Sequence, residues 1–262
     1  MFQVLIQMAA LILSGITWRL ARPMGIDADV ARRVLTGLVY SLLLPALVLV
    51  VLWRTPLGID TGRIALAAAA GVLGTLALAW LAFRLSNTPK PLAGALILAA
   101  AFPNATYMGL PVLEYLLGPT GRSIAIQYDL FACTPILLTL GILLAAAYGE
   151  NNEQAHPLKA LLKVPPLWAA LVAIILNLTG VPMPAAVESW LQMLGGAVIP
   201  LMLLSLGMGL QWSNWKNSYL PLLLPTLVLQ LMVMPLIVMS VAQWLGLSGD
   251  LLLGVTMEAA MP

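Results

Sequence analysis

The sequence predicts a polytopic, all-α membrane protein, and three observations lead to that prediction. Of its 262 residues, 61% are hydrophobic and only 8% are charged, and the mean hydropathy is +1.00, which lies outside the range of soluble globular proteins. The apolar stretches suit helical spans of about 20 residues and are too long for the strands of a barrel. The chain length accommodates roughly nine such spans.

Composition also excludes several classes of function. The formal charge is only +2, with no basic run, so we expect no nucleic-acid partner. The single cysteine, Cys133, cannot form an internal disulfide, and the single histidine, His156, cannot supply a histidine-based metal site. Phosphate-binding glycine loops and nucleophile–base sets do not occur either. We therefore expect no enzyme, no metal and no cofactor.

Apolar runs separated by polar, glycine and proline residues give the elements in order. We place the spans near residues 2–20, 30–53, 63–83, 92–117, 122–148, 163–179, 185–210 and 218–244, with a last span that begins near residue 250. The small residues of span three, such as Gly71 and Gly74, predict close packing of helices. Pro45 and Pro200 predict kinks in spans two and seven.

The distribution of basic residues predicts the orientation. Nine Lys and Arg residues lie in loops that follow odd-numbered spans, and three lie in loops that follow even-numbered spans. Cytoplasmic loops carry the excess of positive charge. We therefore expect a multi-pass protein of the cell membrane with its N-terminus outside.

At an offset of 155 residues, the two halves of the chain have proline and glycine residues at matching positions, which predicts a duplication. At this offset Pro45 aligns with Pro200, and the triplet 92–94 aligns with 247–249. We predict a first repeat of five helices at 1–148, a cytoplasmic linker at 149–157 and a second repeat at 158–262. Because five is an odd number, the second copy enters the membrane inverted, as in many secondary transporters.

The same arithmetic predicts an incomplete second repeat. A full second copy would end at about residue 303 by this logic, whereas the sequence ends at Pro262. We therefore expect the last helix and a half of a 5+5 arrangement to be missing.

Span four contains the string that is most informative about function, at residues 100–111. Pro103 and Pro111 each remove a hydrogen-bond donor, and Gly109 relaxes the backbone between them, so the helix is expected to open into two halves. Such a break is tolerated only beside protein or a watery cavity, and the new helix N-terminus favours an anion. The alternative is a packed, kinked helix that Asn104 caps. The candidate substrate-binding residues here are Asn104, Thr106, Gly109 and Pro111.

Three carboxylates within the apolar spans are further candidates, because ionisable groups at membrane depth are costly. Glu258 lies in the last span, which Pro262 would break in the way that span four is broken, so that two broken helices cross. Asp129 forms a polar island in span five, and Glu114 follows the break in span four. For each of them the alternative is an interfacial or structurally paired side chain.

These motifs resemble the auxin efflux carrier family of membrane transporters, and in particular its bacterial members described as malate or malonate permeases. The resemblance rests on Asn104-x-x-x-x-Gly109-Leu110-Pro111, on Leu44-Pro45-Ala46 and on Glu258-Ala-Ala-Met-Pro262. It implies ten spans in two inverted repeats, with spans one, two, six and seven as a scaffold. The other spans would form a transport domain with broken, crossed helices four and nine.

The resemblance also implies roles for individual residues. Asn104 corresponds to the asparagine that contacts the substrate carboxylate at the crossing, and Gly109 and Pro111 shape the break. Glu258 and Pro262 match the approach to the second break. Pro103 departs from the pattern, because a small residue such as glycine is expected there.

The sequence therefore predicts a secondary transporter for small organic anions such as dicarboxylates, which works by elevator-like alternating access. Glu258, or else Asp129, is expected to exchange a proton, with protons or sodium as the coupling ion. A homodimer is a further expectation. The alternative is a membrane-embedded sensor that binds a small carboxylate without transporting it.

Overall fold

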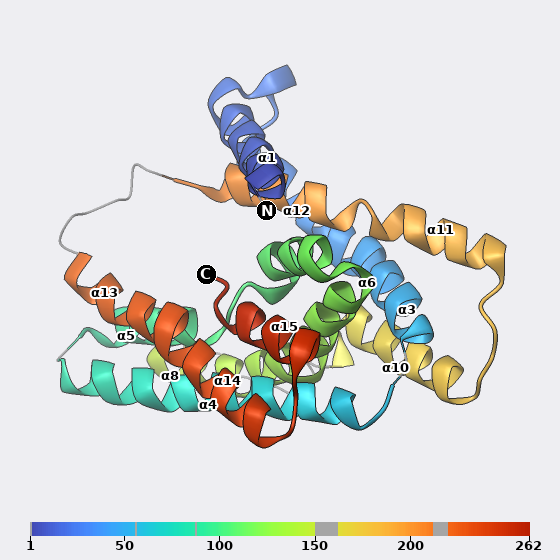
Figure 1. The fold of residues 1–262 in the computed structure, drawn as a ribbon. Helices are drawn as coiled ribbons and strands as arrows, with labels where there is room; N and C mark the ends of the chain where they lie inside the picture. The colour runs from blue at the N-terminus through green and yellow to red at the C-terminus, as the bar shows by residue number, and fades with distance from the viewer. Residues whose placement is uncertain (1, 56, 87, 150–161, 212–219) are drawn as a thin grey trace. The chain divides into compact units, whose positions relative to one another are not determined.

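The computed structural model describes residues 2–55, 57–86, 88–149, 162–211 and 220–262. Every regular element in these ranges is a helix (Figure 1), which confirms the all-α part of the predicted fold class. The chain divides into two compact units by its internal contacts. Unit 1 comprises Met1–Leu57 and Pro165–Trp215, and unit 2 comprises Gly58–Val164 and Lys216–Pro262.

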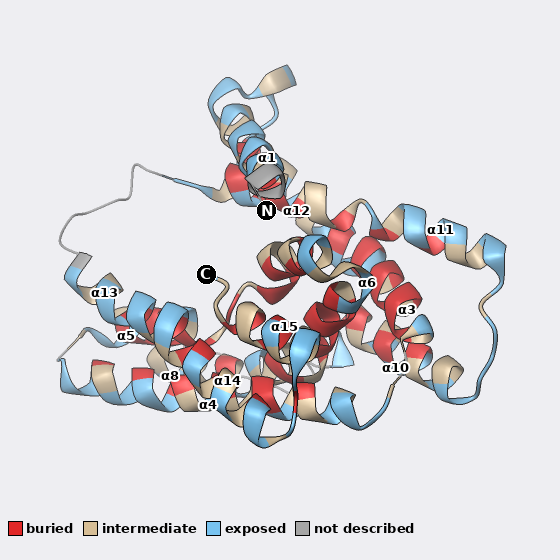
Figure 2. Ribbon diagram, viewed as in Figure 1, coloured by how far each residue is buried: buried red, intermediate tan, exposed pale blue. Residues whose placement is uncertain are grey.

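Unit 1 is built around α3, the most deeply buried of its helices (Figure 2). Its elements are α1 (Phe2–Ala21), the 3₁₀ turn η1 (Pro23–Gly25), α2 (Ala28–Leu38), the π-helical turn η2 (Val39–Leu43), α3 (Leu44–Arg54), α10 (Pro165–Leu178), α11 (Ala185–Gly195) and α12 (Val198–Gly209). Helix α3 packs against α10 and α11, while α12 packs against α1 and α2. Apolar side chains of α3 form the centre of this unit.

Two glycines allow α1 and α12 to approach with their backbones in contact. A Cβ atom added at Gly15 would collide with the carbonyl oxygen of Leu204, and one added at Gly207 would collide with the carbonyl oxygen of Ile12. Small residues permit such close crossings between membrane helices, where van der Waals packing drives association. The crossing therefore depends on having no side chain at either position.

The end of α3 is held by a side chain from α10. The amide of Asn177 donates to the carbonyls of Leu52, Trp53 and Thr55 at 3.0, 2.9 and 2.6 Å. The last carbonyls of a helix have no partner within it. Asn177 therefore supplies hydrogen-bond donors to these carbonyls, which the apolar side chains around them cannot do.

Unit 2 contains the remaining helices and surrounds a second buried centre. Its elements are α4 (Ile59–Leu85), α5 (Lys90–Ala101), η3 (Ala105–Gly109), α6 (Leu110–Tyr128), η4 (Asp129–Cys133), α7 (Thr134–Ile136), η5 (Leu137–Gly141), α8 (Ile142–Tyr148), α13 (Leu220–Val228), η8 (Leu229–Val233), α14 (Met234–Trp244) and α15 (Gly249–Ala259). Helix α4 packs against α5 and α14, and α15 packs against α6 and α14 (Figure 1). The small-residue face of α4 is used as predicted, because Gly71 lies directly against Val238 of α14.

Four π-helical turns, η2, η3, η4 and η8, each end two residues before a proline. The prolines are Pro45, Pro111, Pro135 and Pro235. A proline ring clashes with the carbonyl four residues earlier, which in each case lies inside the π turn. Widening the turn by one residue relieves the clash and lets the helix continue. The predicted kink at Pro45 therefore takes the form of a π turn, whereas Pro200 lies in the first turn of α12, just after α11 has ended.

The helices match the predicted spans to within a few residues. Within the described ranges, five helical stretches are long and apolar enough to cross a membrane, namely Ala28–Arg54, Ile59–Leu85, Lys90–Tyr148, Ala185–Gly209 and Pro221–Trp244. Shorter apolar helices cover Ile6–Ala21 and Pro165–Leu178. The stretch Lys90–Tyr148 contains the predicted spans four and five, which separate at Gly118, where φ is +59°.

Each unit draws its helices from both halves of the chain. Unit 1 contains the predicted spans one, two, six and seven, and unit 2 contains spans three, four, five, eight and nine, which is the grouping that the family resemblance implies. The inverted repeat itself, with its limits 1–148 and 158–262, stays a prediction. Of the predicted linker 149–157, residues 150–157 lie outside the described residues.

Candidate functional site

The break predicted in span four is present. Helix α5 ends at Ala101, and the next helical residue is Ala105. Phe102 has an extended backbone, with φ −114° and ψ 99°, because the ring of Pro103 disfavours a helical conformation in the residue before it. The chain thus opens for three residues between two helical segments that continue one predicted span.

Asn104 lies at the point where the helix begins again. Its backbone carbonyl accepts hydrogen bonds from the amides of Met108 and Gly109, both at 3.1 Å. Asn104 occupies the N-cap position of η3, as the alternative interpretation predicts, but its half-buried side chain makes no cap bond there. An amide group at this position can offer a donor and an acceptor to a bound molecule.

Thr106 and Asp129 form one hydrogen-bonded group across two predicted spans. The hydroxyl of the buried Thr106 donates to one carboxylate oxygen of Asp129, and the hydroxyl of Thr134 donates to the other at 3.0 Å. Asp129 itself is half-buried and begins the π turn η4. Its carboxylate is therefore tied to the break in span four through Thr106.

Glu258 is fully buried against the same break. Helix α15 packs on α6 and η3, and a Cβ atom added at Gly109 would collide with the Glu258 carboxyl group. Neither carboxylate oxygen has a hydrogen-bond partner among the described residues. Asp129 lies close enough for the two carboxylates to repel each other when both are charged. Burying an unpaired carboxylate costs several kcal/mol, so this position is unusual for an ordinary structural residue.

The two prolines in the candidate set lie near the ends of segments that pack against each other, α6 and α15. Pro111 is buried in the first turn of α6, where it shapes the end of η3. Pro262 is exposed and follows α15, which ends at Ala259. A second half-helix after Pro262 stays a prediction.

The sequence interpretation missed Gln230. Its side-chain amide donates to the carbonyl of Met261 at 2.8 Å and so fixes the segment that follows α15. It is 4% exposed, and its side-chain oxygen has no partner among the described residues. An amide in the apolar stretch 220–244 was a signal of the kind that identified Asp129. At the 155-residue offset Gln230 aligns with Thr75, another buried polar residue whose hydroxyl lacks a described partner.

Other candidates from the sequence have structural explanations or lie elsewhere. Glu114 forms an ion pair with Arg122 across the turn at Gly118, so it is structurally paired. Cys133 is buried as a free thiol. Across the described parts of the chain, no group of three or more His, Cys, Asp or Glu residues is placed to hold a metal ion. His156 lies outside the described residues.

The fold and the site together define a class of protein. Apolar helices long enough to cross a membrane carry a broken span, and an amide, hydroxyls and two carboxylates gather around the break. Non-helical backbone at membrane depth that faces polar groups is typical of transporters, in which it contacts the substrate.

Comparison with known proteins identifies the family. The chain belongs to the family described as membrane transport protein, whose model matches residues 3–262 and which is the auxin efflux carrier family that the motifs resemble. It is 31% identical over 240 residues to an uncharacterised transporter of Methanothermobacter thermautotrophicus, covering 90% of this chain and 76% of that protein. An uncharacterised transporter of Methanocaldococcus jannaschii is 32% identical over 120 residues, which is 45% of this chain and 38% of the relative. The protein is therefore a multi-pass membrane transporter rather than an enzyme, and it acts on a small molecule in a lipid bilayer.

Proposed function

We propose that the protein is a secondary transporter for small organic anions such as malate and malonate. The main support is the break at 102–104, where Asn104 starts a helical segment with its side-chain amide uncommitted to a cap. The first amides of a helix lack partners within it and carry a partial positive charge, which favours a carboxylate. The Asn104 side chain can donate a further hydrogen bond to the same group.

We propose an elevator-like mechanism in which the two units have different roles. The residues predicted for the candidate site lie in unit 2, in the segment from the end of α5 to η4 and in α15 with the residues that follow it. Unit 1 is then the scaffold, and unit 2 carries the bound anion between the two sides of the membrane. The basic residues favour an N-terminus outside the cell membrane, and a homodimer stays a prediction.

Glu258 is the residue we assign to energy coupling. Its buried carboxyl group is held between Gly109 and the helices around α15, with no described hydrogen-bond partner. A proton would remove the cost of an unpaired buried charge and reduce repulsion from both Asp129 and an anionic substrate. Glu258 would take up and release that proton during the cycle, with Asp129 as the second candidate and sodium as the alternative coupling ion.

Counterflow in proteoliposomes tests the proposed function. Vesicles loaded with unlabelled malate or malonate are expected to accumulate the labelled compound in a saturable way, and empty vesicles are not. An uncharged compound of similar size serves as the control. Saturable binding without exchange would contradict transport and favour the sensor. An absence of both binding and exchange would remove these dicarboxylates as substrates.

A Glu258→Gln variant tests the coupling. Glutamine keeps the shape of the side chain but cannot take up or release a proton, so counterflow is expected to persist while the response to an imposed pH gradient is lost. Asp250→Asn, at an exposed position in the first turn of the same helix, is the matched control and should retain the response. Proton coupling fails if the unmodified protein ignores the pH gradient.

A further inference from the structure

A polar groove runs along one face of the span Ala28–Arg54 in unit 1, whereas the candidate substrate residues lie in unit 2. It has a volume of about 620 Å³ and is lined by Asp29, Arg32, Arg33, Thr36, Gly37 and Tyr40. These residues recur every three or four positions along α2 and into η2, which places them on one helix face. The groove therefore presents several polar side chains together.

Two arginines give this groove a positive charge. The side chains of Arg32 and Arg33 are exposed, and no ion pair joins either of them to another described residue. The Arg32 guanidinium packs over Gly209 at the end of α12, where a Cβ atom would lie 3.1 Å from one of its nitrogens. Both groups have donors that remain available to an anion.

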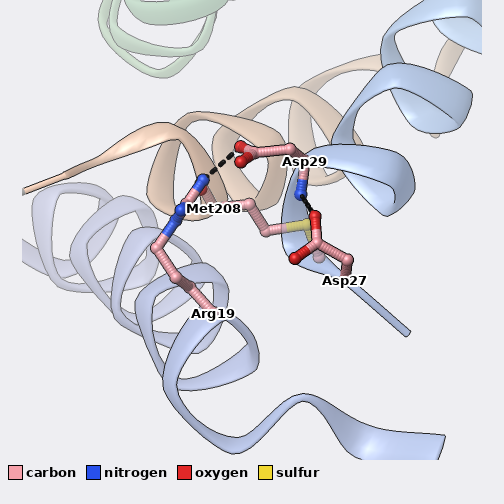
Figure 3. Close-up of polar contacts among 4 residues, drawn as sticks. All are labelled: Arg19, Asp27, Asp29 and Met208. Carbon is pink, nitrogen blue, oxygen red and sulfur yellow. Dashed lines mark hydrogen bonds and ion pairs between the residues drawn. The ribbon is translucent and has the colours of Figure 1, made fainter. Parts of the chain in front are cut away.

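The acidic residue of the groove is already engaged. Arg19 reaches across from α1, forms an ion pair with Asp29 and donates from Nε to the carbonyl of Met208 at 2.5 Å (Figure 3). The side chain of Asp27 accepts the backbone amide of Asp29 at 2.9 Å and caps α2 (Figure 3). Because Arg19 balances Asp29, Arg32 and Arg33 leave the groove with a net charge of about +2.

In a bilayer the arginine end of the groove is expected near the lipid headgroups, and an apolar stripe lies beside the groove. The span Ala28–Arg54 has 27 residues, about 40 Å of helix, which exceeds a hydrocarbon core of about 30 Å and leaves its ends among the headgroups. Arg32 begins about 6 Å into this helix. Val30, Val34 and Leu38 form an exposed stripe next to the groove, as expected for a surface that faces acyl chains.

We propose that this groove is a binding site for an anionic phospholipid. Arg32 and Arg33 bind the phosphate of the headgroup, for which the planar guanidinium supplies paired donors. The acyl chains run along the stripe Val30, Val34 and Leu38. The site lies in the unit that holds none of the candidate substrate residues, so lipid binding is independent of the proposed substrate.

The experiment measures lipid binding to the purified full chain in a neutral detergent. Phosphatidylglycerol with a fluorescent acyl chain is the probe, and its anisotropy reports binding. Unlabelled phosphatidylglycerol should displace it at a concentration about tenfold lower than phosphatidylcholine does. Arg32→Gln/Arg33→Gln should weaken probe binding about tenfold, while the charge-matched control Arg22→Gln/Lys90→Gln, at exposed positions outside the groove, should keep it.

Three results would overturn the proposal. Equal displacement by phosphatidylcholine would mean that the headgroup charge is not recognised. Equal losses in the two double variants would mean that overall positive charge attracts the lipid. Displacement by inorganic phosphate as strong as that by phosphatidylglycerol would mean that a free anion is the ligand. If the groove variant unfolds at a lower temperature than the unmodified protein, Arg33→Gln alone, which leaves Arg32 on Gly209, replaces it and should still lose about threefold in affinity.

Discussion

At the scale of residues, the contact between Gly109 and Glu258 is central to the candidate site. The carboxyl group of Glu258 lies in the space that a side chain at position 109 would fill. Glycine is therefore needed here for close approach rather than for an unusual backbone, because η3 continues directly into the α-helical conformation of Leu110. A carboxylate brought onto the broken span in this way can respond to what binds there.

Gly109→Ala tests this contact. The added methyl group must displace the Glu258 carboxyl group, so we expect a loss of counterflow of about tenfold or more together with a stability loss of about 1–3 kcal/mol. Thermal unfolding in detergent and counterflow measure the two effects. Gly62→Ala is the control, since a Cβ atom there meets nothing within 4 Å and alanine favours a helix interior. Wild-type transport in Gly109→Ala would contradict the contact.

Single polar residues in apolar spans were predictable from sequence, but their partners were not. Asn104, Asp129 and Glu258 stand out because polar groups are rare at membrane depth. The hydrogen bond from Thr106 to Asp129 depends on how η3 is placed relative to η4. The local sequence around either residue does not reveal that placement. Gln230 follows the same rule of rarity but was missed, although Pro225 and Pro235 flank it in the same span.

At the scale of elements, prolines with similar sequence signals have different structural effects. Pro103 opens span four, whereas Pro45, Pro135 and Pro235 follow π turns and leave their helices continuous. The residue before Pro45, Leu44, stays helical at φ −66° and ψ −43°, while Phe102 before Pro103 is extended. Sequence predicts that a proline disturbs a helix, but the surrounding packing selects a widened turn or a break.

The crossing of α1 and α12 provides a prediction at this scale. Gly15→Ala places a methyl group against the carbonyl of Leu204, and the helices must separate, at a cost of about 1–3 kcal/mol. A lower unfolding temperature in detergent is the expected result. Gly37→Ala, in α2 of the same unit, meets nothing within 4 Å and should leave the temperature unchanged or raise it. An unchanged unfolding temperature in Gly15→Ala would mean that the close crossing is absent.

At the scale of the whole molecule, each compact unit mixes early and late helices. The spans and their order were predictable because hydropathy marks each span locally. The assembly of spans one, two, six and seven into one unit came only from the family resemblance, since composition does not reveal which helices touch. Such mixing is typical of transporters built from repeats, whose sites lie where the repeats meet.

Hydrogen exchange tests whether the substrate acts on unit 2 alone. Malate or malonate should slow exchange of the backbone amides at 102–109 and 258–261, because the ligand covers the break and orders the segment that crosses it. Amides of α1 and α12 in unit 1 should exchange at the same rate with and without ligand. Protection confined to unit 1 would contradict the placement of the site.

The most direct test of the account is the affinity of Asn104→Ala for the substrate. Equilibrium binding of labelled malate or malonate to the purified protein is measured beside Ser240→Ala, an exposed polar residue of unit 2 that bonds only to its own helix. The account predicts that Asn104→Ala unfolds at the normal temperature but loses binding, while Ser240→Ala binds like the unmodified protein. Unchanged affinity in a folded Asn104→Ala variant would contradict the central claim that this break holds the transported anion.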